Sequence, residues 1–149
     1  MFKTVVILVS VAWFLAEAAG AADAETDAVR AARERYAGTW KVVAVESDGN
    51  RAPPGGVIVV TNMPDGSWAM VVDGREASRG TSSMDPLATP AEIDIEITEG
   101  DGKGTKLLGI YEVTDARRRL CFRGEKGWRP REFSTASGSG AVLVEFERQ

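Results

Sequence analysis

The sequence predicts an all-β protein, an antiparallel up-and-down barrel of about eight strands behind a short N-terminal helix. Short apolar segments rich in β-branched residues recur at close, fairly even spacing, with turn sequences such as "DGN", "NMPDG" and "GDGKG" between them. "AEIDIEITEG" alternates three isoleucines with polar residues, which is the pattern of a strand with one buried face. No strand–helix alternation is present, so a parallel sheet is not expected. A sandwich remains an alternative, but barrel closure would also protect the strand edges.

Residues 1–22 predict a secretory signal peptide. Lys3 precedes the apolar run "VVILVSVAWFLA", and small residues follow in "AEAAGAA". The alternative, a membrane anchor, needs roughly 20 apolar residues, and Glu17 interrupts this run too early. We therefore expect export to the periplasm or the medium, with no stable membrane insertion after cleavage.

The mature chain divides into a short helix or linker at 23–37 and a barrel domain at 38–149. Asp23 or Thr26 can cap the helix, and Gly38 ends it. Strands are expected at 39–47, 57–61, 67–72, 91–100, 105–113, 118–122 and 141–148, with a short one at 131–135 and a weak edge strand at 75–84. "RAPPGG" reads as a loop, because paired prolines interrupt a central strand.

Composition excludes several functions. The net charge of −4 is unchanged when Lys3 and Glu17 leave with the signal peptide, so the basic character of a nucleic-acid binder is absent. The chain contains no histidine, which rules out Ser-His-Asp triads and histidine-bearing zinc sites. No catalytic residue, metal or cofactor is expected.

Three local features have both a functional and a structural interpretation. Arg118 and Arg129, in the basic segment "ARRRLCFRGEKGWRPR", are candidates for an anionic contact or are solvated strand and turn charges. Asp94 and Glu96 are a candidate acid–base pair or cation site, or the wet face of a strand. Cys121, the one cysteine, is a small buried residue or a reactive thiol.

The mature chain keeps tryptophan, tyrosine and phenylalanine residues that can fill a barrel or line a cavity inside it. We expect Trp40, Trp68, Tyr111 and Phe122 to face the interior. They are the candidate ligand-binding residues.

Several sequence blocks resemble a known family. "GTWKVVAVESDG", "LLGIYE", "LCF" and "RPREFST" occur in this order. The chain resembles the lipocalin-like family of uncharacterised bacterial domains that is abundant in planctomycetes, over Gly38 to Arg148. The resemblance implies a barrel whose narrow end is closed by Trp40, beneath either Arg148 or Arg131. That family has no established activity, so the resemblance implies no catalytic or binding residue.

The sequence therefore predicts an exported, lipocalin-like, non-catalytic module that binds a small apolar or amphipathic ligand in the barrel. The alternative is a packed barrel that acts as a structural or protein-interaction module of the cell envelope, through loops such as 117–131. An enzyme would have to use a carboxylate site without histidine.

Overall fold

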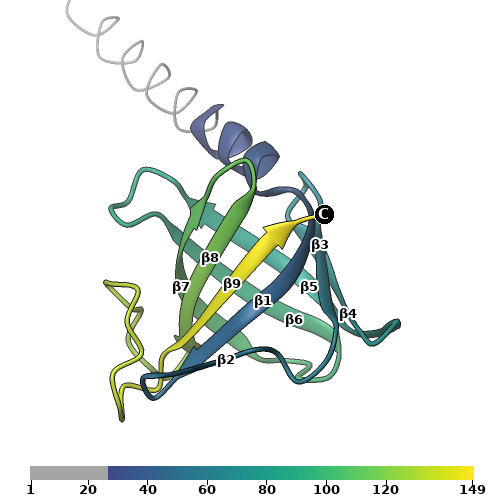
Figure 1. The fold of residues 1–149 in the computed structure, drawn as a ribbon. Helices are drawn as coiled ribbons and strands as arrows, with labels where there is room; N and C mark the ends of the chain where they lie inside the picture. Colours follow the sequence, from purple (N-terminus) through teal and green to yellow (C-terminus); the bar gives the residue numbers. More distant parts are fainter. Residues whose placement is uncertain (1–26) are drawn as a thin grey trace, which may run out of the picture.

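The computed structural model describes residues 27–149, and the expected signal peptide at 1–22 lies outside this range. In the described residues nine antiparallel strands follow one another around a single sheet (Figure 1). They are β1 (Gly38–Ser47), β2 (Asn50–Ala52), β3 (Ile58–Asn62), β4 (Ser67–Val72), β5 (Arg75–Asp85), β6 (Glu92–Gly100), β7 (Lys106–Val113), β8 (Arg117–Gly124) and β9 (Val142–Arg148). Pairing of β1 with β9 closes the sheet into an eight-stranded barrel, with β2 as an appendage on β1. The predicted fold class is confirmed.

The N-terminal helical segment, described over 27–36, lies at one end of the barrel (Figure 1). We call this the closed end. Trp40 Nε1 donates a hydrogen bond of 3.0 Å to the carbonyl of Tyr36, which ties the helical segment to β1. Gly38 joins the two with a φ of 125°, and a Cβ there would lie 2.6 Å from a guanidinium nitrogen of Arg148. Glycine is therefore required at this position, for its backbone conformation and for space.

A bulge in β1 changes which residues face inward. The pairing of β1 with β9 shifts register between Val42 and Ala44, so Val42 and Val45 both line the interior although they are three residues apart. Strict alternation from the sequence would place Val45 on the outside.

One predicted strand is absent, one is present at a different place in the sheet, and one observed strand was not predicted. Strand 75–84 is not an edge strand, because β5 has eleven residues and pairs on both sides. Segment 131–135 forms no strand. The "RAPPGG" loop begins with the short strand β2, which pairs with β1 through a turn at Asp48 and Gly49, both with positive φ.

Apolar side chains form two clusters on opposite sides of the barrel wall. The interior cluster contains Trp40, Ile93, Tyr111, Leu120 and Phe146 among its buried members. The second cluster joins Ile110, Cys121, Ala141 and Leu143, with Phe133 packed against it. Its strand members alternate with inward-facing residues of β7, β8 and β9, so the β8–β9 loop covers the outer wall there.

Candidate functional site

The barrel is hollow. A cavity of about 280 Å³, not fully enclosed, runs along its interior, with walls built from aliphatic and aromatic side chains of the barrel strands. The volume is close to the lower end of ligand pockets, about 300–1,000 Å³. The cavity is nearly twice as large as an engineered apolar cavity of about 150 Å³ that binds benzene in another protein. A small ligand therefore fits inside this protein.

Arg118 is the charged residue of the cavity wall. Its side chain points inward from β8, on the same strand face as Leu120 and Phe122, and is 3% exposed. Its terminal nitrogen donates a 2.7 Å hydrogen bond to the side-chain oxygen of Asn62, which also lines the cavity. The Nε atom is buried and has no hydrogen-bond partner among the described residues.

Three aromatic rings surround this guanidinium. The Arg118 Cζ atom lies 4.3 Å from the ring centre of Tyr36, 4.8 Å from that of Trp40 and 4.2 Å from that of Phe146. Cation–π attraction to these rings partly compensates for lost hydration. No ion pair joins Arg118 to a carboxylate of residues 27–149.

Burial also controls the protonation of this end of the barrel. Burial lowers the pKa of Arg118, the nearby Tyr36 raises it and the positive charge of Arg148 lowers it. Burial raises the pKa of Tyr36, against a smaller lowering by Arg118. Tyr36 therefore remains a neutral phenol and does not supply the missing negative charge.

The four aromatic candidates divide into two pairs. Trp68 and Phe122 line the cavity. Trp40 is 0% exposed and packs beneath Arg148 instead, with the guanidinium 4.1 Å from the ring centre. Tyr111 packs edge-on against Tyr36, 5.3 Å between ring centres, and lies outside the cavity lining. Both of these belong to the closed end of the core.

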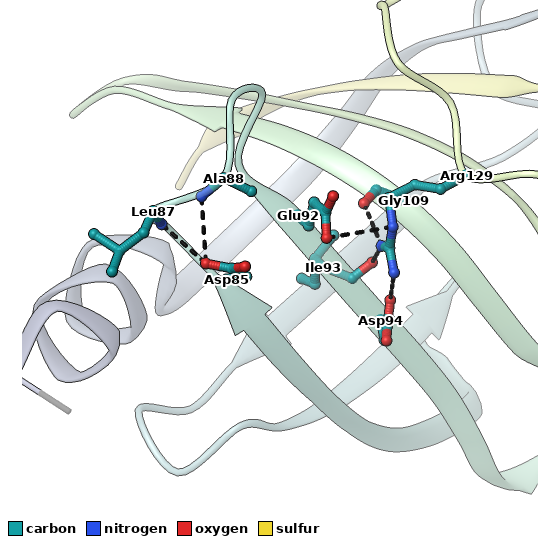
Figure 2. A network of polar contacts seen from close by, with 8 residues as sticks. All are labelled: Asp85, Leu87, Ala88, Glu92, Ile93, Asp94, Gly109 and Arg129. Carbon is teal, nitrogen blue, oxygen red and sulfur yellow. Dashed lines mark hydrogen bonds and ion pairs between the residues drawn. The ribbon is translucent and has the colours of Figure 1, made fainter. Parts of the chain in front are cut away.

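The sequence makes Arg118 and Arg129 candidates for an anionic contact, and the structure places the two on opposite faces of the barrel wall. Arg118 is inside the barrel. Arg129 lies on the outer wall, where its side chain pairs with Asp94 at 2.6 Å and Glu92 at 3.5 Å (Figure 2). The same guanidinium donates hydrogen bonds to the carbonyls of Ile93, at 3.2 Å, and Gly109, at 2.9 Å. Arg129 thus attaches the β8–β9 loop to β6 and β7.

The carboxylates and the thiol do not gather into a reactive site. Asp94 and Glu96 face away from the barrel interior, opposite to Ile93, Ile95 and Ile97. Cys121 is buried in the outer cluster, and burial raises the pKa of its thiol. In the described part of the chain no three histidine, cysteine, aspartate or glutamate residues lie together as metal ligands.

Sequence reasoning missed Asn62 and Ser78 as residues of the cavity wall, and the alternative interpretation of Arg118 as a solvated charge is wrong, because its side chain is buried. Ser78 is 2% exposed, lines the cavity and has a hydroxyl without a partner. A signal for Arg118 was present, since Arg118, Leu120 and Phe122 lie two residues apart and therefore share one face of the strand. Asn62, at the end of β3, and Ser78, in the polar sequence of β5, carry no such signal, because polar residues in strands are usually exposed.

The fold and the cavity define a closed up-and-down β-barrel with a hollow, mainly apolar interior and one buried cation at its closed end. Comparison of the chain with family models, curated proteins and solved structures finds no match to any of them. Within residues 27–149 no helix has the length and apolar character that crossing a bilayer requires.

Proposed function

We propose that this chain is an exported, non-catalytic binding module that holds a small apolar or amphipathic ligand inside its barrel. The observation that carries the proposal is the cavity of about 280 Å³, lined almost entirely by apolar side chains. Burial of apolar ligand surface against such walls supplies a favourable free energy of about 25 cal/mol for each Å² removed from water. The signal-peptide pattern of residues 1–22 supports the assignment to an exported protein.

Filling the cavity tests the proposal. Val60 on β3 lines the cavity, whereas its neighbour Val59 points outward from the same strand. Val60→Phe should abolish saturable binding of the neutral fluorescent probe N-phenyl-1-naphthylamine, and Val59→Phe should leave it intact. Binding that survives Val60→Phe unchanged would place the probe outside the barrel and contradict the proposal.

Native mass spectrometry identifies the natural ligand. The full chain, exported by a bacterial host and purified without detergent, should carry an excess mass that Val60→Phe removes. Persistence of that mass in Val60→Phe would show that the copurified molecule binds elsewhere.

A second candidate function is protein interaction through the β8–β9 loop. Its specific support is Trp128, which is 86% exposed beside the basic residues Arg129 and Arg131. Exposed tryptophan beside arginine is typical of interface hot spots. Trp128→Ala should then reduce capture of envelope proteins by the immobilised chain, while Val60→Phe should not.

A further inference from the structure

The cavity is asymmetric along its length. Arg118 and Asn62 lie in its wall at the closed end, next to the helical segment. The strand register places Val45, Ile97 and Leu107 towards the opposite end, and the hydroxyls of Ser78 and Ser82 are further polar groups of the wall. A ligand that matches this arrangement has a compact polar group at one end and a hydrocarbon chain behind it.

Two partly buried arginines on the outside of the barrel, Arg129 and Arg148, show by contrast how few partners Arg118 has. Arg129 is neutralised by two carboxylates, as described above. Arg148 directs its three guanidinium nitrogens at the carbonyls of Asp115, Ala37 and Arg35. Arg118, with five N–H groups to satisfy, has one hydrogen bond, to Asn62, and no carboxylate among the described residues. Its hydrogen-bonding capacity is therefore largely unused.

An anion is the chemical partner that this guanidinium lacks among the described residues. A buried charge is costly unless it is paired and hydrogen-bonded, and aromatic rings offer no hydrogen-bond acceptor in the plane of the guanidinium. A carboxylate is the small, planar anion whose two oxygens match the arginine fork. The apolar remainder of the cavity favours an unbranched aliphatic chain.

We propose that the barrel binds a linear aliphatic carboxylate, with its carboxylate group on Arg118 at the closed end and its chain along the apolar walls towards the other end. This inference rests on the proposed function and specifies its ligand class. Arg118 is then a binding and specificity residue, and Asn62 holds its guanidinium in place.

Calorimetric titration of the full chain with octanoate, decanoate and dodecanoate, and with the primary alcohols of the same lengths, tests the proposal. The best carboxylate should bind at least about tenfold more tightly than its alcohol, which is the effect of one charge-assisted hydrogen bond. Arg118→Met should reduce this ratio to near one. Arg119→Met removes the same charge from the outward face of the same strand, where Arg119 pairs with Glu112, and should keep the ratio.

The outcomes separate the two proposals. Equal affinities for acid and alcohol in the unsubstituted chain, or a ratio that persists in Arg118→Met, overturn the carboxylate inference and leave the barrel as a binding site. Absence of binding by every acid and every alcohol overturns both.

A measurement on the unsubstituted chain covers the case in which Arg118→Met does not fold. Carboxyl-labelled ¹³C decanoate, followed by NMR in the complex, should titrate at a lower pH than the free acid, because the guanidinium stabilises the ionised form. A bound carboxyl that titrates at or above the value of the free acid would show that it does not contact Arg118, and would overturn the inference.

Discussion

The ring of Trp40 lies 4.1 Å from the guanidinium carbon of Arg148, and through this contact the first and last strands of the barrel meet at the closed end. Arg148 follows the final buried residues of β9 and binds three carbonyl groups beyond the barrel wall, of Arg35, Ala37 and Asp115. The pair therefore joins the helical segment, β1, the β7–β8 turn and β9. Of the two arginines that the sequence offers for this position, the structure selects Arg148.

Trp40→Ala should destabilise the protein by about 3–5 kcal/mol, because it removes a fully buried ring and leaves a cavity. Urea denaturation followed by circular dichroism measures this change. Trp128→Ala, at a position 86% exposed, is the control and should stay within about 0.5 kcal/mol. A loss below about 1 kcal/mol for Trp40→Ala would contradict the role of this ring in the core.

Arg129→Ala should release the β8–β9 loop without emptying the barrel. The substitution removes two carboxylate contacts and two hydrogen bonds to carbonyls, so we expect faster amide exchange over 125–140 and a stability loss of about 1–2 kcal/mol. Binding of the neutral probe in the cavity should persist. The exposed neighbour Arg131 supplies the control, and exchange rates equal in Arg129→Ala and Arg131→Ala would show that the loop is held by other contacts.

The two tyrosines of the folded protein should ionise at a higher pH than tyrosines of the unfolded chain. They are the only tyrosines of the chain, both are buried, and burial, with a smaller contribution from Tyr36, raises the pKa of Tyr111 to about 12. The tyrosinate absorbance of the folded protein should therefore appear at a pH well above 10.0, which is the ordinary pKa of tyrosine. Titration of the urea-unfolded chain provides the reference, and superimposable folded and unfolded curves would refute the prediction.

The same shift has a definite sign for stability. Above pH 10 the unfolded chain loses its phenolic protons first, so the folded state binds more protons and its stability falls as the pH rises from about 10 towards 12. Below pH 10 this contribution is fully present and independent of pH. Urea midpoints measured across this range should decline, and a midpoint that rises above pH 10 would contradict the burial of these phenols.

Cys121 should react with thiol reagents only when the protein unfolds. The side chain is 0% exposed, and burial, more than any other influence, raises the pKa of its thiol, so the reactive thiolate is both scarce and inaccessible. Modification by Ellman's reagent should be slow in buffer and rapid in urea. Rapid modification under native conditions would place the thiol at the surface.

The position of a strand in the barrel was predictable from the sequence where its inner face is apolar. It was not predictable where the inner face consists of small and polar residues. β6 carries Ile93, Ile95 and Ile97 inward and is recognisable from alternation alone. β5 turns Ser78, Gly80 and Ser82 inward, a face without the apolar residues that mark a buried strand. A Cβ at Gly80 would overlap the carbonyl oxygen of Glu96, so backbone proximity, invisible in the sequence, fixes that residue.

The candidate site was predictable only in part, for related reasons. Alternation places Phe122 in the interior, and with it Arg118, but it gives no measure of how much space the side chains leave between them. The bulge that brings Val45 to the cavity depends on pairing between β1 and β9, the two ends of the barrel sheet. Cavity volume and the pairing partner of a charge are properties of the assembled barrel, not of any one segment.

The small inward side chains of β5 allow the cavity volume to be changed by substitutions in this one strand. Gly80 is held by its neighbours, but Ser78 and Ser82 border the cavity and are not part of the aromatic packing at the closed end. Larger side chains at these two positions would shorten the space available to a ligand while leaving Trp40 and Arg148 in place. The length of the interior space can in this way be redesigned independently of the contacts that keep the barrel closed.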